Sequence, residues 1–296
     1  MTEILAVGRR RVAISHPERV VFPDSGLTKL DLARHYATVG EVMVPHVRGR
    51  PLALQSFPQG IAGGAFFLKD APGHFPDWIP TVAVPKREGG TIDQVLADEV
   101  ATLVYLAGQN VITPHVWMSR ADRLDRPDRL VLDLDPTEDD FGQVKRAAAM
   151  VADLFRDAGL EPFAMLTGSR GVHVVAPIRR ELAFPEVFAL SRGLARAAVE
   201  RCPDVLTTEF HKENREAKIF VDDLRNRYAQ TVVPPYAVRA RPEATVATPI
   251  AWDELAEAEP RHWTVRNIGE RAGDAWADIA EAAVSPRSAA RAVEKL

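Results

Sequence analysis

The segment Leu130–Pro136 restricts the fold of this chain more than any other stretch. It is a short apolar run that carries two carboxylates at positions i and i+2 and stops at a proline. Because side chains alternate between the faces of a strand, Asp133 and Asp135 project from the same face, while the aliphatic residues around them can be buried. The proline and the polar residues 137–140 end the strand. The pattern therefore predicts a buried strand with paired carboxylates at its end.

Two carboxylates this close repel each other unless a cationic group sits between them. Hard oxygen ligands on one face suit Mg²⁺ or Mn²⁺, the ions that accompany phosphate groups. Taken alone, a pair such as Asp133 and Asp135 at a strand end is more often a solvated rim than a metal site. The neighbouring polar clusters are what favour the metal site.

One such cluster lies in the segment Met165–Pro177. A glycine-flanked turn offers backbone N–H groups that can form an anion-binding nest, and a β-branched strand follows. The side chains of Ser169, Arg170 and His173 are able to hydrogen-bond phosphate oxygens. The spacing matches neither a Walker loop nor a dinucleotide-binding fingerprint. A hairpin turn with an incidental histidine is the alternative interpretation.

Another apolar strand ends in a carboxylate at Asp222, within the segment Lys218–Asn226. A third carboxylate beside the first pair would complete a two-metal site for in-line phosphoryl transfer. Downstream, Arg239 and Arg241 are expected on one face of a further strand, at a spacing that suits a triphosphate. Each arginine by itself is usually a solvated surface charge.

Hydrophobic spacing and capping residues give an α/β reading of the chain. Thr28 is a suitable N-cap for a helix, with Asp31 three residues later. The arginines of a helical segment over 188–201 are expected to face water. Helices are predicted over 28–47, 91–106, 141–158 and about 270–296, with loops and short strands over 60–90.

Composition limits the class of protein. A hydrophobic content of 46% in 296 residues supports a substantial core. No apolar run is long enough to span a membrane, no signal-peptide region is recognised, and the single cysteine, Cys202, excludes an internal disulfide. We therefore expect a cytoplasmic protein, associated with the nucleoid if it acts on DNA. The net charge of −4 argues against coating DNA by bulk attraction, and local basic patches would have to grip phosphates instead.

The order D-x-D, S-x-G-x-H, D resembles the three-motif signature of the archaeo-eukaryotic primase superfamily. The chain is more closely similar to the polymerase domain of the bacterial multidomain DNA ligase D and its stand-alone relatives. The resemblance covers about residues 12 to 280. It is carried by the three motifs together with the segments Ile14–Pro23, Gly26–Lys29, Arg48–Leu52, Phe66–Lys69, His115–Arg120 and Trp263–Asn267.

This resemblance implies an α/β fold with mixed sheets. The expected architecture is a primase-type, RRM-like catalytic core with an intimately packed smaller N-terminal module. The whole chain, 1–296, would then be a single primase-polymerase domain. Its expected parts are an N-terminal module over about 1–110, a catalytic core over about 111–270 and a peripheral C-terminal helix over about 271–296.

The resemblance also implies roles for individual residues. Asp133, Asp135 and Asp222 match catalytic carboxylates that hold two divalent cations, Mn²⁺ or Mg²⁺. Residues that match contacts to the triphosphate of the incoming nucleotide are Ser169, His173, Arg215 and Arg239, and His115 matches a histidine near the nucleotide sugar. Residues that match DNA contacts are Arg19 and Lys29, for the 5′-phosphate beyond a gap, and Phe66 and Phe67, for the template base.

The implied activity is template-directed, DNA-dependent nucleotidyl transfer of the primase-polymerase type. The enzyme would add ribo- or deoxyribonucleotides to a primer 3′-hydroxyl and fill short 5′-phosphorylated gaps in DNA repair or non-homologous end joining. Expected partners are gapped or broken DNA, NTP or dNTP, and a repair ligase and an end-binding protein on separate chains, because no ligase or nuclease segment is recognised. Alternatives are a two-metal phosphohydrolase or nuclease, a non-catalytic DNA-end binding module, and de novo primer synthesis.

Three positions depart from the pattern of this family. Asp223 stands where the family often has Trp or Tyr, and we expect a solvated neighbour of Asp222, with altered metal loading as the alternative. The segment Leu54–Phe57 is less basic than its counterparts, which puts one phosphate or template contact in question. Arg170 replaces a residue that is often lysine, so the charge is kept.

Overall fold

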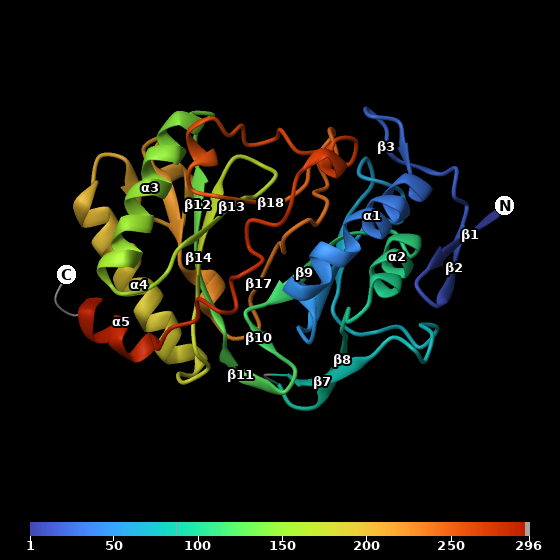
Figure 1. Cartoon of the computed structure of the whole chain (residues 1–296), viewed down its shortest axis with the longest axis horizontal. Coiled ribbons are helices and arrows are strands. Elements are labelled where there is room, and N and C mark those ends of the chain that lie inside the picture. Colours follow the sequence, from blue (N-terminus) through green and yellow to red (C-terminus); the bar gives the residue numbers. More distant parts are fainter. Residues whose placement is uncertain (87, 294–296) are drawn as a thin grey trace. The chain divides into compact units, whose positions relative to one another are not determined.

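The computed structural model describes residues 1–86 and 88–293, which form two compact units (Figure 1). The first unit contains Met1–Asp122, Thr231–Ala247 and Trp263–Ala272, and the second contains Arg123–Gln230, Thr248–His262 and the chain from Gly273 onward. The sequence prediction treats residues 111–270 as one contiguous core. The chain instead returns twice to the first unit, where backbone hydrogen bonds such as Val246 N–H to Trp263 C=O, at 2.8 Å, hold the returning segments.

The second unit is built on a six-stranded sheet of order β15-β16-β12-β14-β13-β18 within the described residues. All neighbouring pairs are antiparallel except β15 and β16. Its elements are β11 (Arg123–Pro127), β12 (Arg129–Pro136), α3 (Phe141–Asp157), β13 (Phe163–Leu166), β14 (Val172–Pro177), α4 (Phe184–Arg201), β15 (Leu206–Thr207), β16 (Ile219–Asp222), β18 (Thr248–Ile250), α5 (Pro286–Val293) and 3₁₀ turns at Lys212–Asn214, Leu224–Asn226 and Glu254–Ala256.

Strand β12 is the predicted carboxylate strand, and it lies inside the sheet between β16 and β14. Leu130, Leu132 and Leu134 are fully buried, whereas Asp133 and Asp135 are partly exposed. Helices α3 and α4 lie together on one side of this sheet (Figure 1). Burying each leucine contributes roughly 1.5–3 kcal/mol. The alternation therefore fixes which face of β12 meets the helices and leaves the carboxylates on the other face.

The helix predicted over 141–158 is confirmed as α3. Asp140 is its N-cap, because a carboxylate oxygen of that residue accepts the N–H of Gln143 at 3.0 Å. The prediction of a helix over about 270–296 is largely wrong within the described residues, since only Pro286–Val293 form the α-helix α5. Turns occupy most of the preceding stretch, where the ring N–H of Trp276 donates to the carbonyl of Ala164 at 2.9 Å. Residues 294–296 lie outside the described residues.

The first unit combines a four-stranded sheet of order β17-β9-β5-β6 with two helices and three hairpins, β1-β2, β3-β4 and β7-β8. Its elements are β1 (Thr2–Val7), β2 (Arg10–Ser15), β3 (Val20–Phe22), β4 (Leu27–Thr28), α1 (Lys29–Val47), β5 (Leu52–Ser56), β6 (Phe66–Leu68), β7 (Thr81–Pro85), β8 (Thr91–Val95), α2 (Val100–Gly108), β9 (Val111–Trp117), β10 (Ser119–Arg120), β17 (Thr231–Val232) and a 3₁₀ turn at Ile268–Glu270.

The predicted helix over 28–47 is confirmed as α1, and Thr28 caps it. The hydroxyl of Thr28 accepts the N–H of Asp31 at 3.3 Å, and the carboxylate of Asp31 accepts the N–H of Thr28 at 2.8 Å. This reciprocal capping box satisfies two N–H groups that the helix itself leaves without partners. It therefore defines where the helix begins, close to two of the predicted DNA-binding residues.

The prediction of one helix over 91–106 is wrong at its N-terminal end. Thr91–Val95 form strand β8, which pairs in register with β7 from Thr81 to Pro85. The helix α2 begins only at Val100. Pairing with a partner strand therefore overrides the helical spacing of the apolar residues. Within the parts of the chain that the structure describes, no helix combines the length and apolar character needed to cross a bilayer.

Candidate active site

Strand register gathers the predicted carboxylates in the second unit. Asp133 on β12 lies directly opposite Asp222 on β16 and, on its other side, opposite His173 on β14. Directly paired residues of neighbouring strands project from the same face, and so does Asp135, two residues along β12. The three predicted carboxylates and the predicted histidine therefore line one face of the sheet.

The electrostatics of this face are those of crowded carboxylates. Burial raises the pKa of Asp135, and the charge of Asp133 raises it further, against the opposing effect of Arg170 and Arg215. Burial also raises the pKa of Asp222, whose side chain is 8% exposed; Arg225 lowers it and Asp133 raises it. Both pKa shifts arise first from burial, which disfavours the charged form, and then from repulsion by Asp133. Positive charge placed among these oxygens would stabilise their ionised form.

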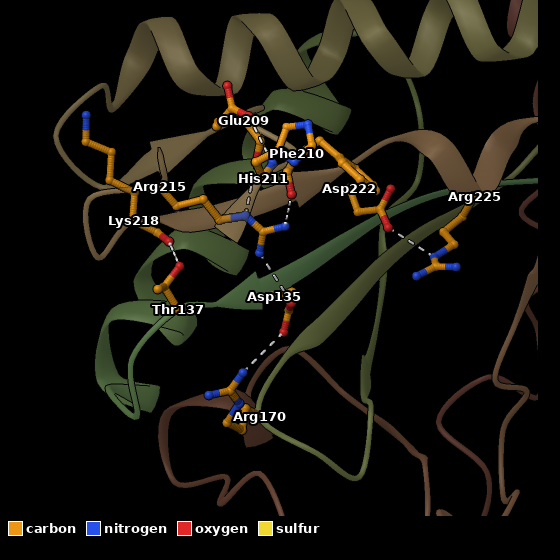
Figure 2. A network of polar contacts seen from close by, with 10 residues as sticks. All are labelled: Asp135, Thr137, Arg170, Glu209, Phe210, His211, Arg215, Lys218, Asp222 and Arg225. Carbon is orange, nitrogen blue, oxygen red and sulfur yellow. Dashed lines mark hydrogen bonds and ion pairs between the residues drawn. The ribbon is translucent and has the colours of Figure 1, made fainter. Parts of the chain in front are cut away.

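Each carboxylate has a basic partner, and Figure 2 shows those of Asp135 and Asp222. Oδ1 of Asp135 lies 3.9 Å from Nη2 of Arg170, and Oδ2 lies 3.6 Å from Nη1 of Arg215. Oδ2 of Asp133 lies 3.4 Å from Nε2 of His173. The carboxylate of Asp222 is 3.1 Å from Nε of Arg225 and also accepts a backbone N–H at 2.8 Å.

These pairings decide how the site relates to a metal. Among the described residues, no group of three or more His, Cys, Asp or Glu side chains is arranged as a coordination shell. In Figure 2, Asp222 points toward Arg225 and Asp135 lies between Arg170 and Arg215. The donor chemistry still fits Mg²⁺ or Mn²⁺, since aspartate oxygens on adjacent strands are hard ligands.

The predicted glycine-flanked turn is confirmed as the connection between β13 and β14. Its two ends are joined by Thr167, whose N–H and hydroxyl both donate to the carbonyl of Gly171, at 3.1 and 3.0 Å. Gly168 has a φ of +67°, which favours glycine. The carbonyl of Ser169 accepts Nε of Arg261 at 3.2 Å. The turn is thus fixed by hydrogen bonds between its own ends and by one hydrogen bond from Arg261.

Gly171 has a different reason to be glycine. A Cβ built at this position would lie 2.2 Å from the backbone carbonyl oxygen of Leu134 and 3.7 Å from Oδ1 of Asp133. The bare backbone therefore lets the turn pack against the carboxylate strand at its closest point. His173, two residues later on β14, is 3% exposed.

Arg215 is fixed before it reaches the carboxylates. Its Nε donates to the carbonyl of Glu209 at 3.0 Å, and its Nη2 donates to the carbonyl of Phe210 at 2.7 Å. The guanidinium also stacks on Phe220, with Cζ 4.1 Å from the ring centroid. The group that contacts Asp135 is therefore preorganised by the loop between β15 and β16, as Figure 2 shows.

The basic residues predicted to hold a 5′-phosphate come together in the first unit. The N–H of Lys29 donates to the carbonyl of Arg19 at 2.8 Å. Lys29 is 3% exposed, and its Nζ donates to the carbonyl of Gly108 at 3.2 Å. Burial lowers the pKa of Lys29, and the charge of Arg19 lowers it further. Two cations that repel each other favour an anion close by.

The predicted stacking residues also lie in the first unit. Phe66 and Phe67 on β6 are 50% and 49% exposed. The ring of Phe67 meets His115 of β9 edge to face, with centroids 5.3 Å apart. Exposed aromatic rings on a fixed strand are unusual and suit contact with a ligand. Arg239 belongs to this unit too.

The strand predicted to carry Arg239 and Arg241 is not present. This stretch is a turn, with only an isolated bridge between Val238 and Val246, and the N–H of Arg239 donates to the carbonyl of Thr245 at 2.7 Å. The structure thus brings Asp133, Asp135, Asp222, Ser169, His173 and Arg215 together in the second unit, and it places Arg19, Lys29, Phe66, Phe67, His115 and Arg239 in the first.

Asp223 is not the solvated neighbour that the sequence suggests. It is 7% exposed, and its Oδ2 accepts Nε of Arg192 on α4 at 3.2 Å. The expectation that the arginines of 188–201 face water is confirmed for Arg196 and Arg201, which are exposed, although Arg201 also pairs with Asp157 at 2.7 Å; Arg192 is only partly exposed. Both pairs join residues more than 30 positions apart, so helical spacing carries no signal of them.

Sequence reasoning also missed Asn226. Its Oδ1 accepts the N–H of Val131 at 2.9 Å, and its Nδ2 donates to the carbonyl of Val131 at 2.6 Å. Strand β16 pairs with β12 only from Asp133 onward. The Asn226 amide therefore stands in for a missing strand residue and braces the carboxylate strand. An asparagine three to four residues after a strand end was the available signal.

Comparisons with known proteins agree on one family. Residues 28–279 match the family described as LigD, primase-polymerase domain. The chain is 31% identical over 264 residues to the multifunctional non-homologous end joining protein LigD of Mycolicibacterium smegmatis, covering 88% of this chain and 34% of that protein. It is 25% identical over 257 residues to the bifunctional non-homologous end joining protein LigD of Bacillus subtilis, covering 86% of this chain and 41% of that protein.

A solved structure is similar over nearly the whole chain. It is the polymerase domain from Mycobacterium tuberculosis ligase D in complex with DNA, with a TM-score of 0.86 and 30% sequence identity. The match covers 93% of this chain and all of that one. The mixed α/β fold expected from the resemblance is thereby confirmed. The chain spans only about a third of the length of the first curated relatives.

Proposed function

Because the chain belongs to the LigD primase-polymerase domain family, whose members are repair nucleotidyltransferases, we propose that it extends a primer 3′-hydroxyl across short 5′-phosphorylated gaps. The observation that carries this proposal is the row formed by Asp222, Asp133 and His173 on three adjacent strands, with Asp135 beside it. Nucleotidyl transfer needs this combination, in which carboxylates hold cations and basic groups hold phosphates.

In this proposal Asp133, Asp135 and Asp222 hold two divalent cations, Mg²⁺ or Mn²⁺. When bound, such cations lower the pKa of the primer hydroxyl and neutralise the leaving pyrophosphate. Burial raises the pKa of Asp135 and Asp222, and the charge of Asp133 raises both further; bound cations would offset both effects, which supports this role. Protonated carboxyl groups are poor ligands, so cation binding by these residues weakens as the pH falls.

The triphosphate is held by Ser169, His173, Arg215 and Arg239. Arg215 is already oriented by two backbone carbonyls and a phenyl ring, so little conformational entropy is lost when it binds phosphate. The turn around Ser169 is fixed by the Thr167–Gly171 hydrogen bonds. Such preorganised groups contribute orientation and electrostatic stabilisation in the transition state.

Residues of the first unit contact DNA and the nucleotide sugar. Arg19 and Lys29 grip the 5′-phosphate beyond the gap, which is supported by the backbone hydrogen bond that holds the two residues together. Phe66 and Phe67 pack on the template base, because an exposed ring can stack on any base. His115, in contact with Phe67, lies near the nucleotide sugar.

The cellular role follows from the relatives. The relatives are named as non-homologous end joining proteins, and this chain spans about a third of their length. We infer that the chain fills gaps at broken ends and that ligation and end binding are supplied by other protein segments. The experiment described next also measures which nucleotide sugar the protein prefers and whether it prefers Mg²⁺ or Mn²⁺.

The decisive experiment measures extension across a short gap with a 5′-phosphorylated downstream strand. Ribo- and deoxyribonucleotides are compared in Mg²⁺ and in Mn²⁺. Asp135→Asn removes one charge without changing shape and should lower the rate by roughly a thousandfold or more, while gap binding persists. Asp278→Asn is the matched control, because Asp278 is exposed and lies on the turn before α5.

Each other outcome points to one alternative. Primer shortening in the absence of nucleotides, lost in Asp135→Asn, would indicate a two-metal nuclease. Tight gap binding without extension under either metal would identify a DNA-end binding module. Equal extension by wild type and Asp135→Asn would refute the assigned catalytic role. Extension from a template without primer would add de novo synthesis.

A further inference from the structure

A cavity of about 470 Å³ lies between α4 and the loop that joins β15 to β16, and its lining does not include Asp133, Asp135 or Asp222. Its walls include Arg192 and Arg196 of α4, Arg227 and Asp223 after β16, and the rings of Phe210 and Phe220. The volume lies in the range of pockets that take small organic groups. All of its lining residues belong to the second unit.

The cavity carries more positive than negative charge. Asp223 neutralises Arg192 at 3.2 Å. Arg196 and Arg227 are exposed, and neither forms an ion pair with the described residues. The wall therefore has an excess of two positive charges, which favours an anionic ligand.

Two of the three arginines in the wall stack on an aromatic ring. The guanidinium groups of Arg192 and Arg227 both stack on Phe188, with Cζ 4.6 and 4.5 Å from its ring centroid. Two cations on one ring repel each other, and an anion between them relieves that repulsion. Stacked guanidinium groups keep their N–H groups in a fixed plane, the geometry that suits phosphate oxygens.

An aromatic surface completes the wall. Phe210 is 60% exposed, although exposure of a phenyl ring to water is unfavourable. It meets the ring of Phe220 edge to face, at 6.3 Å between centroids. Figure 2 shows Phe210 beside Arg215 on the loop. A flat ring beside fixed arginines is the arrangement that binds a base and its phosphate together.

The cavity adjoins the proposed reaction centre through two residues. Asp223, in its wall, directly follows the carboxylate Asp222. Phe220, also in its wall, supports the guanidinium of Arg215, which contacts Asp135. A nucleic-acid strand with one nucleotide in the cavity therefore lies close to the carboxylates.

We propose that this cavity binds one nucleotide unit of a single nucleic-acid strand, with the base on Phe210 and the phosphate on Arg196 and Arg227. The proposal deepens the proposed function, because it gives the primer strand a subsite next to the carboxylates. Free nucleoside monophosphate has the same chemistry, and the experiment separates the two sources.

The test measures binding of a dye-labelled eight-nucleotide oligo(dT) by fluorescence anisotropy across a range of salt. Arg196→Gln should weaken binding about fivefold and lower the slope of log affinity against log salt by about one. Phe210→Ala should weaken binding about fivefold or more at an unchanged salt slope, and Phe210→Tyr should restore it. Arg291→Gln on α5 removes the same charge from an exposed helical position outside the cavity and should change nothing.

Gap extension by the same variants gives an independent readout. Arg196→Gln and Phe210→Ala should raise KM for the primer end severalfold and leave KM for the nucleotide unchanged. Wild-type oligonucleotide binding without any extension would end the proposed function but leave the cavity assignment standing. If the wild-type protein extends primers, and Arg196→Gln and Phe210→Ala bind the oligonucleotide as tightly as Arg291→Gln does, the cavity assignment alone would be overturned.

The source of the nucleotide is decided by competition. Unlabelled oligo(dT) should displace the labelled strand at far lower concentrations than dTMP. Displacement by dTMP at the same concentration as unlabelled oligo(dT) would overturn the assignment to a nucleic-acid strand and would show that the cavity binds a free nucleotide.

Discussion

Gly171→Ala tests whether the turn between β13 and β14 sets the position of the carboxylate strand. A new Cβ would lie 2.2 Å from the carbonyl oxygen of Leu134, whereas real Cβ contacts essentially never fall below 3.0 Å. The turn and β12 must therefore separate by roughly 0.8 Å or more. Because the carbonyl belongs to the backbone, no side-chain rotation can absorb the shift. Asp133 and Asp135 flank that carbonyl and would move with it.

The magnitude follows from the size of this displacement. Misplacing a catalytic group by about 1 Å costs on the order of a hundredfold in rate. Forcing an extra methyl group into a packed region costs about 1–3 kcal/mol of stability. We therefore expect kcat for gap extension to fall roughly a hundredfold, while the protein unfolds several degrees lower but remains folded at the assay temperature.

The assay pairs single-turnover extension with thermal unfolding followed by circular dichroism. Gly73→Ala is the matched control, because a Cβ at Gly73 meets nothing within 4 Å and the φ angle there is not strained. The control should keep both rate and unfolding temperature. A Gly171→Ala protein that extends primers at the wild-type rate would show that the contact with Leu134 does not position the carboxylates.

Three further predictions concern stability. Thr28→Ala removes the N-cap of α1 and should cost about 1 kcal/mol in urea unfolding, whereas Thr28→Ser should cost little. His35 is buried and its pKa is lowered to about 4, so the unfolded chain takes up a proton on this residue at a higher pH than the folded protein does. The free energy of unfolding therefore keeps the full contribution of His35 above about pH 6.5 and falls by about 3 kcal/mol as the pH drops to about 4. His35→Gln should not show this fall when unfolding is measured against pH. Asn226→Ala leaves the N–H and C=O of Val131 buried without partners and should cost about 3 kcal/mol in urea unfolding; a loss below about 1 kcal/mol would show that β12 does not depend on this brace.

Local physics explains which features the sequence alone determined. The alternation in Leu130–Pro136 places Asp133 and Asp135 on one face whatever the strand pairs with, because the period of a strand is two. The capping box at Thr28 likewise depends only on residues three apart. The glycine-flanked turn and the helix α3 follow from similarly short-range preferences. These features, with the order of the three motifs, were enough to predict the mixed α/β fold and the carboxylate strand.

Only the tertiary structure decided features that join distant residues. Thr91–Val95 became a strand because β7 offered a partner, although the spacing of apolar residues favoured a helix. Asp223 became buried because Arg192, 31 positions earlier, supplied a compensating charge. The side-chain amide of Asn226 hydrogen-bonds the backbone of Val131 in β12, which lies 95 positions earlier in the chain. Pairing, burial and charge compensation act between surfaces that exist only after folding, so local sequence patterns carry no record of them.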